Sequence, residues 1–189
     1  MIIILVMICA QADSLMAQSR TGIYLTAQDY LAEKLTYPDA ENLKLNDFLG
    51  GKHINFTSEG KKVKLSKAEI FGYRLNGADF RFYNKEAYQI LDTAGFTLYS
   101  HVQLMPQGKG YTTSTRYFFS ISKSAPVTEL TIANISKSFA AQTDFRYSIE
   151  NYFHSDASLA TYDRLNKQYE IKYLYFEHQH HAAAQHASL

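Results

Sequence analysis

The chain of 189 residues has 46% hydrophobic and 20% charged residues, a composition typical of a folded globular protein with a substantial core and not of a disordered one. Its formal net charge of +1 lacks the strongly basic balance of nucleic-acid-binding domains, so we expect no nucleic-acid partner.

The amino terminus has the features of an export signal. An apolar run from Ile2 to Ala10 is followed by Ala10-Gln11-Ala12, a small-x-small pattern that signal peptidases cleave, and cleavage after Ala17 is an alternative. The run is too short to span a bilayer as a helix. We therefore predict a cleavable signal peptide at residues 1–17 and an exported mature chain, periplasmic or secreted, without a transmembrane span. The other interpretation of this run is a buried amino-terminal strand.

The only cysteine, Cys9, lies within this segment. The mature chain would then contain no cysteine, which excludes disulfides, a cysteine nucleophile and thiolate metal sites. A lipid anchor on Cys9 would need a small residue before it, and Ile8 stands there.

The first element of the mature chain is predicted to be a short strand that leads into a short helix, within residues 22–37. Thr26 and Asp29, three residues apart, resemble a capping box at the start of that helix. Pro38-Asp39 then predicts a turn.

The segment INFTSEGKKVKL, residues 54–65, predicts a β-hairpin that turns at Glu59-Gly60. Phe56 then lies opposite Val63 and Ile54 opposite Leu65, while a hydrophilic face alternates with them.

The stretch FGYRLNGADFRFY, residues 71–83, predicts a second hairpin. Asn76-Gly77 suits a two-residue turn because both central residues need positive φ. This turn places Tyr73 opposite Phe80 and Arg74 opposite Asp79, with the latter pair exposed. The predicted apolar face comprises Phe71, Tyr73, Leu75, Ala78, Phe80 and Phe82, and the polar face Gly72, Arg74, Asp79 and Arg81.

The rings of residues 71–83 have two interpretations. Burial of one large aromatic side chain contributes about 1.5 to 3 kcal/mol, so core formation is favoured. The alternative is a sheet face that is left uncovered to bind a ligand.

Further strands follow. Residues 87–101 predict a strand pair that turns near Asp92 to Gly95, and residues 113–122 predict a strand with Tyr117, Phe119 and Ile121 on one side. Between them, residues 106–110 are interpreted as a hairpin tip.

The apolar spacing becomes helical beyond Ala125-Pro126. Ile132, Ile135 and Phe139 predict a helix capped by Thr131, and residues 144–153 predict a second helix whose face contains Phe145, Ile149 and Tyr152. The last segment fits a helix through Tyr162, Leu165, Tyr169, Tyr173 and Phe176, or a strand through Tyr169, Ile171, Tyr173 and Tyr175. The helix has more matches and is preferred.

The predicted fold class is α+β: an antiparallel sheet, built as a meander or as barrel-like hairpins, followed by two to three carboxyl-terminal helices packed on it. Residues 18–125 form the mainly antiparallel β region and residues 126–177 the helical region, which together complete one unit. Residues 178–189, rich in alanine and histidine, are expected to be a disordered tail.

The motifs TGIYLTAQDYLAEKLTY, KLND, KAEIFGYRLNGADFRFYNKEAYQIL, YFFSIS and LTIANISKSF, in that order, resemble those of a group of exported bacterial proteins of unassigned function. The resemblance covers most of the mature chain. It implies export, and it implies no catalytic or binding residues.

Three arrangements of reactive residue types are present. His154-Ser155-Asp156 contains the residues of a catalytic triad, but sequence neighbours rarely adopt triad geometry. Acids available for glycoside hydrolysis include Asp29, Glu33, Asp79 and Glu86. Four histidines near the carboxyl terminus could bind a transition metal: His178, His180, His181 and His186. His53 and His101 lie in predicted strands and are interpreted as structural.

None of these patterns is specific, so we assign no catalytic, cofactor-binding or metal-binding residues and expect no cofactor. The sequence favours an exported, non-enzymatic module that binds a protein partner, an envelope component or a small ligand. The alternatives are an extracytoplasmic hydrolase with an unrecognised acid or histidine site, and a metal-binding histidine tail.

Overall fold

The computed structural model describes residues 20–46 and 51–186, with side chains described as far as His180. The predicted signal peptide at residues 1–17, with Cys9, lies outside the described residues. The chain divides between Ile90 and Leu91 into two compact units, and each is considered by itself below.

The larger sheet of the first unit is antiparallel throughout, and its strand order is β2-β1-β6-β7-β8. Helix α2 connects β1 to β2, and the predicted capping box is confirmed: the Asp29 backbone N–H donates to the Thr26 hydroxyl at 3.0 Å, and the Thr26 N–H donates to the Asp29 carboxylate at 3.0 Å. These elements are β1 (Gly22–Tyr24), α2 (Ala27–Leu31), β2 (Tyr37–Pro38), β6 (Gly72–Leu75), β7 (Ala78–Tyr83) and β8 (Glu86–Asp92), of which the last two residues, Leu91 and Asp92, belong to the second unit.

A second, three-stranded sheet of this unit contains β3 (Glu41–Lys44), β4 (His53–Ser58) and β5 (Lys61–Ser66). The predicted register of its hairpin is confirmed, with Phe56 opposite Val63 and Ile54 opposite Leu65. Its turn residues Glu59 and Gly60 have φ of 50° and 74°, as this type of turn requires.

The β6–β7 hairpin also has the predicted register, with Tyr73 opposite Phe80 and Arg74 opposite Asp79. Asn76 and Gly77 have φ of 52° and 77°. A Cβ at Gly72 would lie 1.9 Å from the Phe80 carbonyl oxygen, so only glycine fits where these two strands approach each other.

Aromatic side chains of this hairpin form part of the core of the first unit. Tyr73 and Phe82 are buried, and the rings of Tyr73 and Phe80 stack with centroids 4.7 Å apart. The same cluster contains Ile23, Ile54, Phe56 and Ile70. The interpretation of these rings as core residues is therefore confirmed for Tyr73 and Phe82.

The prediction of an exposed polar face on this hairpin is wrong. Arg81 is buried, and the side chains of Arg74 and Asp79 are only 13% and 18% exposed. Phe71 precedes β6, and its ring does not lie on the predicted apolar face with Tyr73. The Phe71 ring instead stacks on Tyr30 of α2, and the Arg81 guanidinium lies 5.8 Å from the centroid of the Phe71 ring. The aromatic rings of β1 and α2 cover the face that the alternation alone leaves to solvent.

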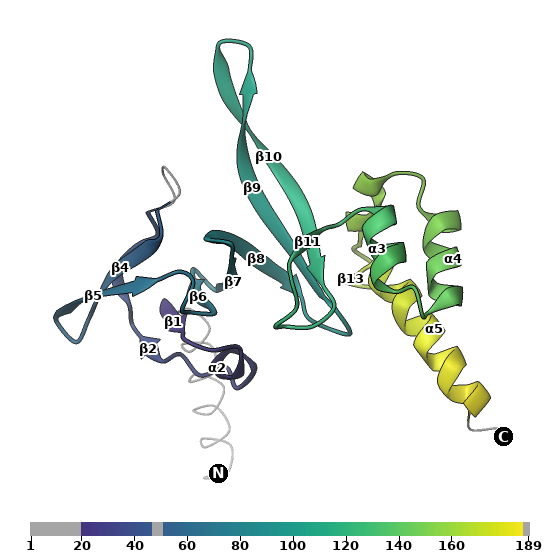
Figure 1. Cartoon of the computed structure of the whole chain (residues 1–189), viewed down its shortest axis with the longest axis horizontal. Helices are drawn as coiled ribbons and strands as arrows, with labels where there is room; N and C mark the ends of the chain where they lie inside the picture. Colours follow the sequence, from purple (N-terminus) through teal and green to yellow (C-terminus); the bar gives the residue numbers. More distant parts are fainter. Residues whose placement is uncertain (1–19, 47–50, 187–189) are drawn as a thin grey trace, which may run out of the picture. The chain divides into compact units, whose positions relative to one another are not determined.

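The second unit consists of a long hairpin followed mainly by helices (Figure 1). Its elements are β9 (Thr97–Gln107), β10 (Gly110–Ser120), β11 (Thr128–Glu129), α3 (Ile132–Ser138), α4 (Thr143–Tyr152), the 3-10 helix η1 (Asp156–Ala160), β12 (Tyr162–Asp163), β13 (Gln168–Tyr169) and α5 (Glu170–His186). The predicted cap at Thr131 is confirmed, because its hydroxyl accepts a hydrogen bond from the Asn134 N–H. The predicted hairpin tip is also confirmed, because the pairing of β9 with β10 ends at Gln107 and Gly110. The α+β class, with antiparallel sheets and mainly carboxyl-terminal helices, is confirmed.

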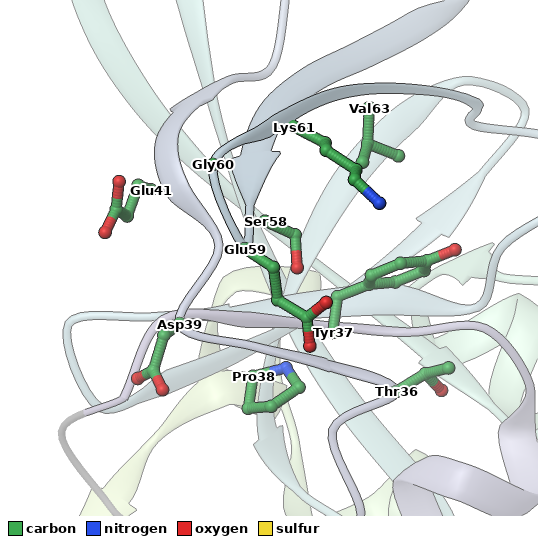
Figure 2. A pocket seen from close by; sticks show the side chains of 10 residues that line it. All are labelled: Thr36, Tyr37, Pro38, Asp39, Glu41, Ser58, Glu59, Gly60, Lys61 and Val63. Atoms are coloured by element: carbon green, nitrogen blue, oxygen red, sulfur yellow. The ribbon is translucent and has the colours of Figure 1, made fainter.

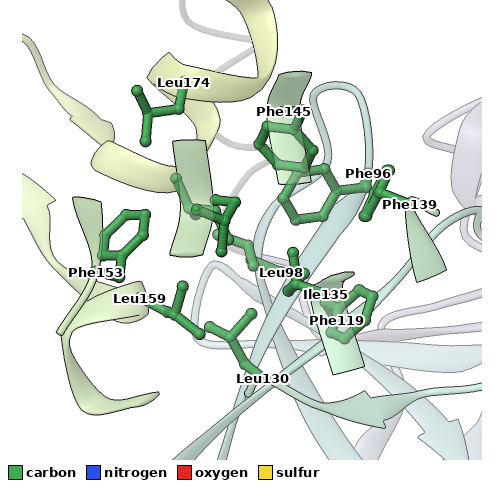
Figure 3. Packing of buried hydrophobic residues seen from close by; sticks show 12 residues of the cluster. Phe96, Leu98, Phe119, Leu130, Ile135, Phe139, Phe145, Phe153, Leu159 and Leu174 are labelled. Carbon is green, nitrogen blue, oxygen red and sulfur yellow. The ribbon is translucent and has the colours of Figure 1, made fainter. Parts of the chain in front are cut away.

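One hydrophobic core joins the hairpin of the second unit to its helices (Figure 3). Leu98 and Phe119 of the hairpin, Phe139 at the end of α3 and Phe145 of α4 belong to a single buried cluster, which is completed by Phe96, Leu130, Ile135, Ile149, Phe153, Leu159, Ile171 and Leu174. The β strands before residue 125 and the helices after residue 126 therefore share this core within the second unit.

The last predicted helix is wrong over its first half. Residues 162–169 form the β12–β13 hairpin, in which the Asp163 carboxylate accepts hydrogen bonds from the backbone N–H groups of Leu165 and Asn166. Leu165, predicted to be on the apolar face, is 93% exposed. Turn chemistry at Asp163 therefore outweighs helical spacing.

Three further expectations need correction. Helix α5 continues to His186, so the tail predicted to be disordered from residue 178 is helical that far. Tyr152 and Ile121, assigned to apolar faces, are exposed because each lies at or beyond the end of its element.

Phe145→Ala tests the core of the second unit. Phe145 is fully buried and contacts the rings of Phe139 and Tyr175, so we expect the free energy of unfolding to fall by about 3 to 5 kcal/mol. The control Tyr147→Ala removes a ring from the same helix that is 53% exposed and should change it by no more than about 0.5 kcal/mol. Equal effects in denaturant titrations would contradict this packing.

Candidate functional site

The β9–β10 hairpin carries an exposed apolar surface. Leu98 pairs with Phe119, and the register continues without interruption to Gln107 and Gly110. Because successive side chains alternate between faces, the face that is buried at Leu98 and Phe119 also contains Val102, Leu104, Pro106 and Tyr111. We call these last four residues the apolar row.

The apolar row is uncovered by the rest of its unit. Val102 is 60% exposed, Leu104 69% and Tyr111 76%, and the distal part of the hairpin extends past the helices of the same unit (Figure 1). Contiguous exposed apolar side chains mark interaction surfaces more often than isolated ones do. The row can therefore contact an apolar partner without any rearrangement of the core at its base.

The charged side chains of this hairpin are all positive. Residues 97–120 contain Lys109 and Arg116 and no aspartate or glutamate. Arg116 is already paired with the Glu129 carboxylate of β11. The sequence patterns do not predict this surface, because residues 106–110 are interpreted only as a hairpin tip and the second strand is predicted to begin at residue 113. Period-two alternation through Leu98, Val102 and Leu104 was the available signal.

A polar pocket of about 550 Å³ lies in the first unit, between the segment around Pro38 and the β4–β5 turn (Figure 2). Its lining includes the carboxylates of Asp39, Glu41 and Glu59 and the amine of Lys61. All four residues are exposed, and in Figure 2 the Asp39 and Glu41 carboxylates lie apart from that of Glu59. The arrangement resembles a solvated groove and provides no desolvated pair of acids for acid–base catalysis.

Ser148 of α4 and His178 of α5 form a pair that the sequence analysis did not predict. The Ser148 hydroxyl is hydrogen-bonded to His178 Nε2 at 2.7 Å, the contact that a serine nucleophile makes with its base. His178 also lines a hollow of about 390 Å³ together with Asp144 and Gln142, but Ser148 is not part of that lining. Separation by 30 residues in the sequence leaves no local motif for this pair.

The residues singled out from the sequence serve local structure. Asp156 accepts a hydrogen bond from the backbone N–H of Ile132, Ser155 precedes η1 as its cap, and His154 is exposed, so the three do not form a triad. Of the four acids, Asp29 caps α2 and Asp79 pairs with Arg74, while Glu33 and Glu86 are exposed.

The histidine tail is only partly described. His178 bonds to Ser148, His180 is exposed, and the side chains of His181 and His186 lie outside the described residues. Among described side chains, no group of three or more histidine, cysteine, aspartate or glutamate residues could hold a metal ion.

A polar network links β1 to the β6–β7 hairpin. The Arg74 guanidinium donates two hydrogen bonds to Asp79 at 2.7 and 2.8 Å, and the Tyr24 hydroxyl donates to the same carboxylate at 3.0 Å. Burial, followed by the charge of Asp79, raises the pKa of Tyr24. The hydrogen bonds to Asp79 raise the pKa of Arg74. The network is fully engaged within the fold and serves to hold its strands together.

Lys172 is the most deeply buried cation of the second unit among the described residues. Its amine donates to the carbonyl oxygens of Ala94 and Phe96, lies 3.5 Å from the Asp92 carboxylate and lies 3.8 Å from the centroid of the Phe96 ring. It thereby ties α5 to the turn before β9. Burial lowers the pKa of Lys172 to about 8, against the opposing charge of Asp92.

Searches of protein-family models, curated proteins and solved structures find no match to this chain. The resemblance to exported bacterial proteins therefore stays a prediction. Within the described part of the chain, no helix combines the length and the apolar character needed to cross a membrane.

Stability should depend on pH through Lys172. Its pKa is lower in the folded state than its ordinary value of 10.5, so the burial cost is fully present below about pH 8 and is relieved as the folded protein loses the proton. From about pH 7.5 to about pH 9.5, we expect the free energy of unfolding to gain about 2 kcal/mol relative to Lys172→Met. Denaturant titrations of both proteins measure this difference. Parallel pH profiles would contradict the assignment.

Proposed function

We propose that this chain is an exported, non-enzymatic binding protein that contacts a protein or another envelope component through the apolar row. The exposure of Val102, Leu104 and Tyr111 on a face that is core at its base carries the proposal. Burial of one such side chain contributes about 1.5 to 3 kcal/mol, so a partner that covers the row gains enough for specific binding.

The surroundings of the reactive groups support the proposal that the chain is not an enzyme. Asp79, Asp156 and Lys172 are each engaged in bonds that connect elements of the fold. The acids around the polar pocket are exposed, where carboxylates lack the desolvation that tunes catalytic groups.

Capture from an envelope extract of the source cells tests the contact surface. The bait is the chain recovered from the envelope, and we expect Val102→Ser with Leu104→Ser to lose the captured partner because two apolar contacts are removed. The control Leu165→Ser changes a leucine that is 93% exposed in the β12–β13 turn and should retain capture. Retention by the double variant would contradict the proposal.

Export is checked on the same material. The intact mass of the recovered bait should correspond to cleavage after Ala12 or after Ala17. A mass that corresponds to residues 1–189 without cleavage would contradict a cleaved signal.

An extracytoplasmic hydrolase is the second candidate, and the Ser148–His178 hydrogen bond of 2.7 Å is the observation that favours it. A serine activated by this histidine would react with a fluorophosphonate probe, and Ser148→Ala or His178→Gln would abolish labelling while Ser155→Ala would not. If the chain is a non-enzymatic binding protein, the wild-type chain should not be labelled. Labelling that depends on both residues would overturn the non-enzymatic assignment.

A further inference from the structure

We propose that the partner binds by strand addition: an extended, acidic segment of another polypeptide pairs with the outer edge of β10, from Tyr111 to Thr115, and directs carboxylates at Lys109. This inference rests on the proposed function and specifies the chemistry of the partner. It follows from the direction of the backbone groups, from a proline on the opposite strand and from the charge of the hairpin.

The outer edge of β10 has backbone groups available for another strand. The Leu130 N–H donates to the Tyr117 carbonyl at 2.9 Å, so the polar groups of Tyr117 face away from β9. Backbone groups alternate between the two edges of a strand, and those of Thr115, Thr113 and Tyr111 therefore face the same way. In the described part of the chain, β11 pairs with Phe118 and Phe119 only, which leaves this stretch without a neighbouring strand.

The edge of β9 is less suited to the same role. Pro106 lies opposite Tyr111. In an antiparallel pair, the backbone groups of two opposed residues either both face the partner strand or both face away from it. Because those of Tyr111 face away from β9, those of Pro106 face away from β10. Proline has no N–H, so a position that would donate from the β9 edge is blocked. Natural proteins protect edge strands in this way. β10 contains no proline between Gly110 and Ser120 and is open to pairing.

Strand β11 is an example, within this chain, of a strand with an acidic side chain that pairs with the outer edge of β10. It pairs with the base of β10, and its Glu129 carboxylate forms an ion pair with Arg116. An added strand would continue the same edge toward the tip, where Lys109 is exposed. With no acid in residues 97–120, the hairpin is complementary in charge to an acidic segment. Alternate apolar side chains of that segment would extend the apolar row.

A second copy of this chain fits the edge less well. Antiparallel self-pairing centred on Thr113 would place Arg116 of one copy opposite Gly110 and beside Lys109 of the other. Because Arg116 is already paired with Glu129 and residues 97–120 contain no acid, the hairpin of a second copy would offer Lys109 no carboxylate. The charge pattern therefore favours a different, acidic polypeptide.

Fluorescence anisotropy with two synthetic peptides tests this inference. Both alternate valine and serine, and they differ only in ending with two glutamates or with two lysines. We expect the acidic peptide to bind at least about tenfold more tightly than the basic one. Thr113→Pro removes an outward N–H from the edge and should abolish binding, while Thr113→Val keeps the N–H and should bind within about twofold of wild type. Lys109→Glu should reverse the preference between the peptides.

The outcomes separate this inference from the proposed function. Circular dichroism and thermal unfolding establish that Thr113→Pro is folded, and slowed exchange of the Tyr111, Thr113 and Thr115 amides in the wild type on peptide addition tests the pairing without any substitution. Binding that survives Thr113→Pro, equal binding of both peptides, no binding of either, or a dimer formed without peptide would overturn strand addition. If Thr113→Pro still captures the envelope partner and the variant of the apolar row does not, strand addition fails and the proposed function stands.

Discussion

The alternation of side chains along the β9–β10 hairpin determines which residues of this hairpin are buried and which are exposed. Leu98 and Phe119 must face the helices because they complete the core of the second unit. Given the uninterrupted register, the residues farther along the same face have no freedom to turn inward. The burial of Leu98 and Phe119 therefore determines which face carries Val102 and Leu104. Because the core of this unit does not reach these two side chains, covering them requires something outside this core.

The base of the hairpin is held firmly, which makes its distal part a predictable surface. Lys172 binds the two carbonyl groups of the turn before β9 and lies against the Phe96 ring. Phe96 in turn contacts Phe139 and Tyr175. A charged group so deeply buried costs stability, and its position fixes the start of β9 relative to α5. A preformed surface of this kind loses little conformational entropy on binding.

Local chemistry in the sequence predicted most turns and caps but not what covers each face. Asn76-Gly77 and Glu59-Gly60 specified two registers correctly, because turn geometry and apolar alternation agreed there. Phe71 and Arg81 could not be placed from alternation, since rings from β1 and α2, more than 40 residues away, cover that side. Leu165 was misassigned because the Asp163 turn competes with helical spacing. The apolar row was visible in the sequence as alternation, but its exposure depends on where the helices end in space.

Amide hydrogen exchange of the isolated protein along β10 tests whether this edge is open. We expect an alternating pattern, in which the outward amides of Tyr111, Thr113 and Thr115 exchange much faster than the inward amides of Thr112 and Ser114, which face β9. Toward the base, the Phe119 amide also faces outward, but β11 pairs with Phe119 there, so its exchange should be slow. Equally slow exchange of both sets at the distal end would show that this edge is already covered, and would rule out an open binding surface there.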